Sequence, residues 1–242
     1  MLNYKNPNSL AAIDALILCG GAGSRLRPII SDRPKGLAPV HGRPFLDILI
    51  EDLTQQGFRR IIFCVGHFKE QIIARYQSRN DAEYLFSREN IPLGTGGAVQ
   101  NALPLIRSNT FLVMNGDSRC HIDFSEFYRF HLDKGAEASF VLTESENRHD
   151  GGAVNIDKAQ QVSCFSEKPS QHAHKRLINA GIYLAQIGAM EIQNIPPPFS
   201  LEYDVFPVLV KTKPCFGFVV KSQLVDIGTP ERYRKANENW RQ

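Results

Sequence analysis

Short apolar runs alternate with helix-like segments through the first half of the chain, and this alternation limits the possible folds more than any other feature. Three of the runs, at 15–19, 60–66 and 110–115, are apolar stretches of strand length. Such runs are typical of parallel sheets that are buried on both faces. Longer segments with helical spacing, for example 44–56 and 69–77, separate them. We therefore expect an α/β fold with a doubly wound, mostly parallel, Rossmann-like sheet.

The second half of the chain has a different pattern. Residues 152–165 resemble a hairpin, two further strands are expected at 178–184 and 216–221, and a helix is expected at 202–210. We expect these elements to form a smaller β subregion, as in GT-A-like folds. Because no repeat, low-complexity tract or linker interrupts the sequence, it predicts a single domain over 1–242.

Composition excludes several classes of protein. The 28 Lys and Arg residues against 25 Asp and Glu give a net charge of +3, too small to predict nucleic-acid binding. No apolar run reaches the roughly 18 residues of a membrane span, so no membrane partner is expected. The five cysteines are scattered singly, which argues against disulfides and a zinc site. A reducing compartment, the cytoplasm, is therefore expected.

The segment 18–40 follows the first strand directly and combines glycines with cations. Glycines let backbone N–H groups approach an anion closely. The carboxyl end of a strand is also where doubly wound sheets bind nucleotides. The alternative is a structural turn with a solvated basic loop, but the three cations Arg25, Arg27 and Lys35 favour a phosphate site.

Two common nucleotide-binding loops do not match this segment. A P-loop requires a Gly-Lys pair followed by Ser or Thr, and no such triplet occurs in the sequence. The dinucleotide fingerprint GxGxxG also fails, because Leu26 stands where its third glycine would be. Neither a P-loop enzyme nor an NAD enzyme is expected.

Several short motifs, in order along nearly the whole chain, resemble those of the sugar-nucleotidyltransferase family. They are GGAGSRLRP (20–28), PKGLAPV (34–40), LGTGG (93–97), NGD (115–117), EKP (167–169), NAGIY (179–183) and DIGTP (226–230). Each later motif is weak alone, but their shared order and spacing are specific. The departures from the family pattern, Cys19, Gly36 and Ser118, remove no charged group.

The resemblance implies transfer of a nucleotidyl group from a nucleoside triphosphate to a sugar 1-phosphate, with release of pyrophosphate. Both reactants are anions, so cations and positioning should supply most of the catalysis. Arg25 would bind the triphosphate, and Lys35 would bridge phosphate groups near the α-phosphorus. The remaining nucleotide-binding residues implied by the family are Gly20, Gly21, Gly23, Ser24, Gly94, Thr95 and Gly96.

Asp117 and Asp226 match the aspartates that hold Mg²⁺ in the family. Mg²⁺ prefers a few carboxylates together with substrate phosphates. A turn-capping role is the structural alternative for each aspartate. Because Lys35, Asp117 and Asp226 are all present, an enzyme is favoured over a non-catalytic sugar-nucleotide sensor.

The family motifs place the nucleotide in the half formed by about residues 1–120 and the sugar in about 121–242. Lys168 would bind the sugar 1-phosphate and Glu167 the sugar hydroxyls. The alternative is that the two residues form a surface ion pair. The other sugar-side residues implied are Gly152, Asn179, Gly181 and Glu202.

The segment SLEYDVFP (200–207), with the other motifs, most resembles short bacterial enzymes that make GDP-D-glycero-α-D-manno-heptose, a sugar nucleotide for lipopolysaccharide or capsule. GTP is then the expected donor, and Glu202 the candidate partner of the extra sugar hydroxyl. A helix N-terminal carboxylate is its alternative role. Mannose-1-phosphate guanylyltransferases and N-acetylmuramate-1-phosphate uridylyltransferases remain alternatives for the activity. A monomer or a homodimer is expected.

Overall fold

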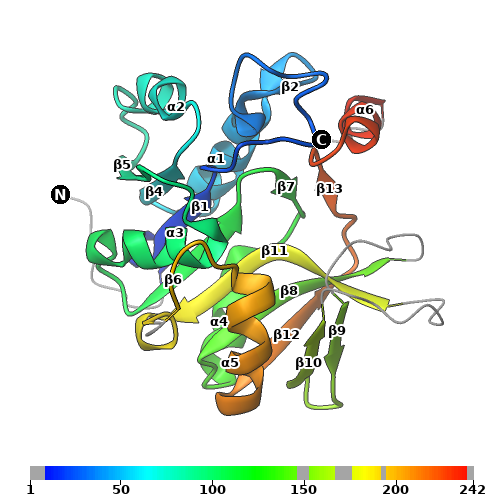
Figure 1. The fold of residues 1–242 in the computed structure, drawn as a ribbon. Helices are drawn as coiled ribbons and strands as arrows, with labels where there is room; N and C mark the ends of the chain where they lie inside the picture. The colour runs from blue at the N-terminus through cyan, green and yellow to red at the C-terminus, as the bar shows by residue number, and fades with distance from the viewer. Residues whose placement is uncertain (1–8, 146–152, 167–175, 192–194, 239–242) are drawn as a thin grey trace.

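The computed structural model describes residues 9–145, 153–166, 176–191 and 195–238. Within these residues a nine-stranded sheet crosses the molecule and helices cover both of its faces (Figure 1). The doubly wound class expected from the sequence is therefore confirmed. Gly152, Glu167 and Lys168 lie outside the described residues.

The first half of the chain forms a four-stranded parallel part of the sheet. Its strands are β1 (Asp14–Leu18), β4 (Arg60–Val65), β5 (Glu83–Arg88) and β6 (Thr110–Asn115). They lie in the order β5-β4-β1-β6, and each neighbouring pair is parallel. The carboxyl ends of these strands consequently meet at one edge of the sheet.

The second half continues the same sheet with a change of direction. Strand β11 (Arg176–Gln186) is antiparallel to β6 on one side and to β8 (Ala138–Ser145) on the other. Strand β12 (Cys215–Val220) runs parallel to β8. The expected hairpin is present as β9 (Ala153–Ile156) and β10 (Val162–Ser166). Strand β8 is thus separated from the four parallel strands of the first half by β11.

Helices form one layer on each face of the sheet. One buried cluster contains residues of α1 (Phe45–Gln56), α2 (Lys69–Tyr76) and α4 (Phe124–Asp133). The other contains residues of α3 (Gly94–Ala102) and α5 (Phe206–Thr212). The last helix, α6 (Pro230–Glu238), packs beside the small strand β13. No helix among the described residues is both long and apolar enough to cross a membrane.

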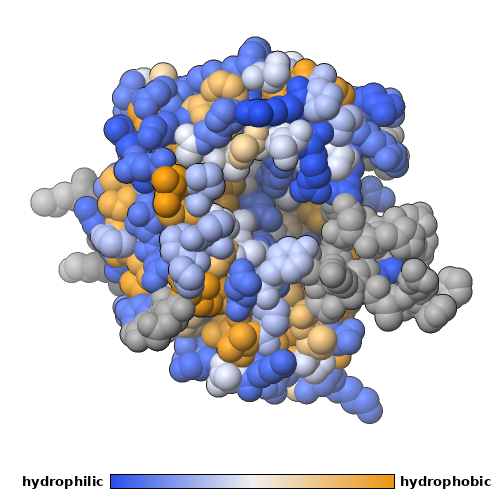
Figure 2. Space-filling model, in the orientation of Figure 1, coloured by the Kyte–Doolittle hydropathy of each residue, from blue (hydrophilic) through white to orange (hydrophobic). Residues whose placement is uncertain are grey.

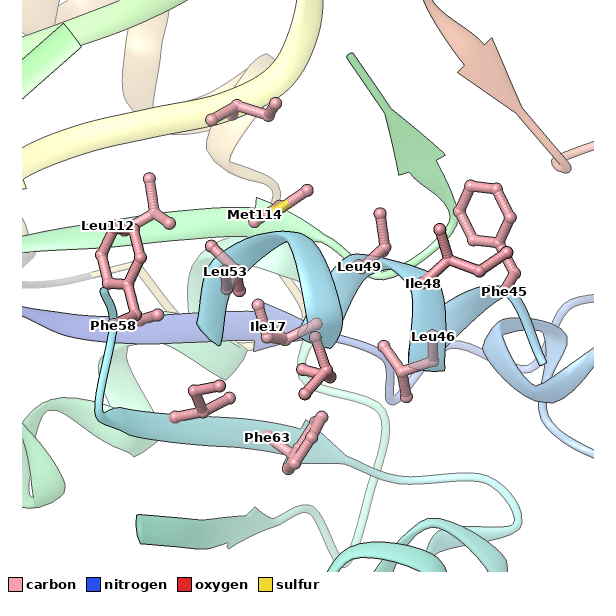
Figure 3. Packing of buried hydrophobic residues seen from close by; sticks show 14 of the residues in the cluster. Ile17, Phe45, Leu46, Ile48, Leu49, Leu53, Phe58, Phe63, Leu112 and Met114 are labelled. Atoms are coloured by element: carbon pink, nitrogen blue, oxygen red, sulfur yellow. The ribbon is translucent and has the colours of Figure 1, made fainter. Parts of the chain in front are cut away.

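Helix α1 shows how the sequence forms this layered core. Leu49 and Leu53, one helical turn apart, are buried beside Ile17 and Met114 of the central strands (Figure 3). Each fully buried side chain of this size contributes about 1.5–3 kcal/mol. The helix ends as predicted at Gly57, whose φ of 113° is in the left-handed region that glycine adopts readily.

One helix differs from the prediction. The helix expected at 202–210 is a π-helical turn, Leu201–Val205, followed directly by α5. The 3₁₀ turns are Leu10–Ala12, Lys35–Leu37, Leu103–Leu105 and Ile187–Ala189.

Two very short ladders complete the fold. One pairs β2 (Pro39–Val40) with β3 (Arg43–Pro44), and the other pairs β7 (Ser118–Arg119) with β13 (Val225–Asp226). In the second ladder Asp226 lies opposite Ser118. The ladder therefore brings together two motifs that are more than one hundred residues apart in the sequence.

Candidate active site

A cavity of about 710 Å³ lies at the carboxyl ends of the parallel strands. Figure 2 shows this face hollowed near its centre, with hydrophilic and neutral residues around the hollow. Its walls come from the segments that follow β1, β4, β5 and β6. The predicted residues that line it are Gly20, Gly21, Gly23, Lys35, Gly94, Thr95 and Asp117.

The glycine-rich loop after β1 is fixed by close backbone contacts. The carbonyl oxygen of Gly20 accepts a hydrogen bond from the His67 N–H at 3.1 Å. A Cβ on Gly66 would lie only 2.6 Å from that same oxygen, so the two loops approach as closely as backbone allows. Gly23 has a φ of 62° and accepts from the Leu26 N–H, which starts the turn that carries Arg25.

Lys35 and Asp117 form the charged centre of the cavity wall. Lys35 Nζ donates to Asp117 Oδ2, and the two side chains are 18% and 27% exposed. Burial raises the pKa of Asp117, but the Lys35 charge and hydrogen bond, the Ser118 hydroxyl and the Arg25 charge together lower it below its usual value. The Asp117 carboxylate is therefore ionised at neutral pH.

Asp226 lies across the β7–β13 ladder from this pair. Its side chain is only 6% exposed, and its Oδ1 accepts from the Gly228 N–H at 2.9 Å. The Ile227 N–H donates to the Asp117 carbonyl at 3.0 Å, which ties the two aspartate segments together. A bidentate pair between Arg119 and Asp52, at 2.6 and 3.0 Å, anchors the ladder to α1.

This donor set fits a divalent cation of the Mg²⁺ type. The described residues contain no group of three or more His, Cys, Asp or Glu that could hold a metal. Asp117 lines the cavity and directly precedes β7, whereas Asp226, in the paired strand β13, lies outside the cavity lining; both supply hard carboxylate oxygens. Mg²⁺ is commonly bound by one or two carboxylates, with water and substrate phosphates completing its shell.

Arg25 and Ser24 lie at the rim and not on the cavity wall. Both residues are exposed. The guanidinium of Arg25 is close to the aspartate pair, because its Nη2 is 3.9 Å from the position of a Cβ on Gly228. Arg25 therefore lies where it could meet phosphate groups that leave the cavity.

The predicted glycines of α3 have a clear packing role. Gly94 has a φ of 75°, and a Cβ there would lie 2.3 Å from the Phe199 carbonyl oxygen. A Cβ on Gly96 would lie 2.5 Å from the Phe199 ring, and the Gly96 N–H donates to the Phe199 carbonyl at 3.0 Å. Gly94 and Thr95 line the cavity, whereas Gly96 is buried behind it.

Glu202 and Asn179 belong to one hydrogen-bonded network behind the wall. The Glu202 carboxylate accepts from the hydroxyls of Thr95 and Ser200, both at 2.8 Å, and of Tyr183 at 3.3 Å. The Asn179 side chain donates to the Tyr183 hydroxyl at 2.6 Å and accepts from the Gly181 N–H at 2.9 Å. The network therefore connects the sugar-side motifs to Thr95 on the cavity wall.

Gly181 lies beside the end of β6. Its φ is 73°, and a Cβ there would lie 2.6 Å from Asn115 Nδ2, so only glycine fits without displacing Asn115. The register of β11 against β8 shifts between Asn179 and Tyr183, so the irregularity in the strand pairing coincides with Gly181. Asn115 itself lines the cavity.

Comparison with known proteins identifies the chain. Residues 14–242 match the family described as Nucleotidyl transferase. The chain belongs to the nucleotidyl transferase family. The family, the enzyme class and the fold predicted from the motifs are thereby confirmed.

Individual relatives of this nucleotidyl transferase carry related activities. It is 31% identical to the D-glycero-α-D-manno-heptose 1-phosphate guanylyltransferase of Aneurinibacillus thermoaerophilus, over 93% of this chain and 97% of that protein. It is 32% identical to a mannose-1-phosphate guanylyltransferase catalytic subunit beta of Drosophila pseudoobscura pseudoobscura, over 90% of this chain but only 60% of that protein. The crystal structure of HddC from Yersinia pseudotuberculosis complexed with GMP-PN is also similar. Its TM-score is 0.81 at 35% identity, and the match covers 93% of this chain and 98% of that one.

Motif analysis did not select five polar residues that line the cavity of this nucleotidyl transferase: His67, Lys69, Glu89, Asn90 and Asn115. Glu89 directly follows β5, and its Oε1 would lie 2.7 Å from a Cβ on Gly20. Burial raises the pKa of Glu89. The rule that ligands bind at strand carboxyl ends would have identified His67, which directly follows the strand predicted at 60–66.

Proposed function

We propose that this nucleotidyl transferase transfers a guanylyl group from GTP to D-glycero-α-D-manno-heptose 1-phosphate and releases pyrophosphate. The single observation that carries the choice of base is the Glu89 carboxyl group on the cavity wall, facing Gly20. The similarity to a heptose 1-phosphate guanylyltransferase over nearly the full length of both proteins supports the choice of sugar.

The hydrogen-bonding pattern of guanine matches a carboxylate. Guanine presents N1–H and the 2-amino group side by side, and an ionised carboxylate offers two acceptor oxygens at a similar spacing. Uracil, thymine, cytosine and adenine do not present this adjacent pair of donors. In the proposed complex Glu89 accepts both hydrogen bonds.

The residues at the other end of the cavity suit the phosphate chemistry. An oxygen of the sugar phosphate attacks the α-phosphorus of GTP, the bond to the α–β bridging oxygen breaks, and pyrophosphate leaves. Lys35 would hold the α-phosphate, while Arg25 would neutralise charge on the leaving pyrophosphate. A Mg²⁺ ion held by Asp117 and Asp226 would add Lewis-acid stabilisation of the phosphate oxygens.

For the sugar side we keep Glu167, Lys168 and Gly152 as proposed ligands. For Glu202 we now propose an indirect role, because three hydroxyl groups already donate to its carboxylate. Glu202 would hold Thr95 and Tyr183 in place rather than reach the heptose. Glu202→Ala should then lower kcat/KM for heptose and mannose 1-phosphates by the same factor, and a selective loss with heptose would contradict this role.

A turnover panel tests the proposed function. Pyrophosphate release is measured with GTP, ITP, UTP, CTP, ATP and dTTP against heptose, mannose and glucose 1-phosphates. We expect GTP with heptose 1-phosphate to give the highest kcat/KM. ITP lacks the 2-amino group, so wild type should prefer GTP over ITP and Glu89→Gln should lose most of that preference. An unchanged GTP-to-ITP ratio in Glu89→Gln would remove Glu89 from base recognition.

Mannose 1-phosphate is the second candidate acceptor, because mannose-1-phosphate guanylyltransferases are comparably similar over this chain. A higher kcat/KM with mannose 1-phosphate than with the heptose would select it. We further propose that the enzyme acts in the cytoplasm as a monomer or a homodimer. Its five free cysteines are consistent with a reducing compartment.

A further inference from the structure

Arg232 contacts one of the two proposed metal-binding aspartates directly. Its Nη1 lies 3.2 Å from Asp226 Oδ2 and 3.4 Å from Oδ1. The Arg232 side chain is 25% exposed, whereas that of Asp226 is 6% exposed. The guanidinium therefore lies between a nearly buried carboxylate and solvent.

The backbone holds both partners in this geometry. The Arg232 N–H bonds to the Thr229 hydroxyl at 3.3 Å at the start of α6, which fixes the first turn of the helix. The Asp226 carboxylate is fixed by the Gly228 N–H at 2.9 Å. A Cβ on Gly228 would lie 3.1 Å from Asp226 Oδ1, so a side chain at position 228 would press on the carboxylate.

Each of the two aspartates is therefore in contact with a cationic side chain. Lys35 contacts Asp117, and Arg232 contacts Asp226. The guanidinium of Arg25 also lies near this group, at 3.9 Å from the position of a Cβ on Gly228. An arginine is always charged, so Arg232 cannot leave the carboxylate by losing its proton.

A cation at a carboxylate opposes the binding of another cation there. The guanidinium and a metal ion require the same oxygen lone pairs, and their charges repel each other. A nucleoside triphosphate reduces this competition, because its phosphates can bind the guanidinium and supply further oxygen ligands to the metal.

We propose that Arg232 is the resident counter-ion of Asp226: it positions the carboxylate before substrate arrives and competes with free metal for it. The inference rests on the proposed function, in which Asp226 is a metal ligand. Metal then binds weakly to the free enzyme and tightly together with the nucleotide. Arg232 is a positioning residue in this scheme and takes no part in bond formation.

Direct metal binding tests the proposal without relying on turnover. Mn²⁺ is titrated into the nucleotide-free protein, and free Mn²⁺ is followed by electron paramagnetic resonance. Arg232→Gln should bind Mn²⁺ about fifteenfold more tightly than wild type, the factor expected for removing one unit charge about 5 Å from a doubly charged ion in a water-like dielectric. Arg232→Lys keeps the charge and should bind as weakly as wild type. The exposed Arg234 lies on the same helix, and Arg234→Gln is the matched control that should change nothing.

Thermal unfolding provides a second readout. Without metal, Arg232→Gln should unfold at a lower temperature than wild type, because a nearly buried carboxylate loses its counter-ion. Mn²⁺ should raise the midpoint of this variant more than that of wild type. Equal or weaker Mn²⁺ binding by Arg232→Gln would overturn the inference. If Asp226→Asn combined with Arg232→Gln binds Mn²⁺ as tightly as Arg232→Gln alone, the metal site of the proposed function fails instead, so the two failures are distinguishable.

Discussion

Replacing Lys35 by methionine removes one of the lysine charges that line the cavity and leaves a side chain of similar length. Lys35 Nζ contacts Asp117, and neither side chain is more than 27% exposed. At an effective dielectric of about 20, two charges about 4 Å apart interact by about 4 kcal/mol. Loss of one preorganised donor to a transferring group typically costs about 2.7–4 kcal/mol. We therefore expect kcat to fall roughly 10²–10³-fold.

The assay is pyrophosphate release at saturating GTP and heptose 1-phosphate, with circular dichroism to confirm the fold. Lys69→Met is the matched control, because Lys69 lines the same cavity but its Nζ lies 3.5 Å from a backbone carbonyl, that of Glu89. We expect this control to keep activity within about fivefold, because this half-buried ammonium bonds to a neutral backbone carbonyl, a hydrogen bond worth about 1 kcal/mol. A folded Lys35→Met enzyme with near-normal kcat, or equal losses in both variants, would refute the reasoning.

Three further predictions concern metal, packing and pH. Asp226→Asn should raise the Mg²⁺ concentration needed for half-maximal turnover at least tenfold; unchanged Mg²⁺ dependence would contradict its role. Asp14, 3% exposed, accepts from Arg60 at 2.6 Å and from two backbone N–H groups, so Asp14→Ala should lower the urea-derived free energy of unfolding by about 3–5 kcal/mol. Burial lowers the pKa of His131 from 6.5 to about 4. Between these pH values His131 is therefore protonated in the unfolded state and neutral in the folded state. The free energy of unfolding should fall by about 3 kcal/mol from pH 6.5 to 4, and His131→Gln should show a shallower fall.

Local pattern was sufficient for most of the elements. The strand Thr110–Asn115 matches the predicted bounds and the helix Phe45–Gln56 starts one residue later than predicted, because an apolar run and an amphipathic period depend only on neighbouring residues. The partner of a strand does not depend on its own residues alone. The position of β11 between β6 and β8 is set by long-range pairing that no periodicity encodes.

The candidate site was also predictable only in part from the sequence. Lys35 and Asp117 were predicted from motifs, and the structure places them in contact. Glu202 illustrates what motifs omit: its segment was recognised, but its hydrogen bonds to Thr95 and Tyr183 depend on chain segments that meet only after folding. Arg232 was not selected either, because its significance depends on the distance to Asp226 and not on its place in a motif.

The position of β11 between β6 and β8 also determines which fragments and chimeras of the enzyme can fold well. Residues 182–186 of β11 cover the hydrogen-bonding edge of β6, from Thr110 to Met114. A fragment ending near residue 120 would contain the glycine loop, Lys35 and Asp117, yet it would expose that edge of a buried, apolar strand to other molecules. Bare edges of this kind promote strand pairing between chains. Domain-swap chimeras between relatives of different sugar preference should therefore exchange β11 together with the strands on both sides of it.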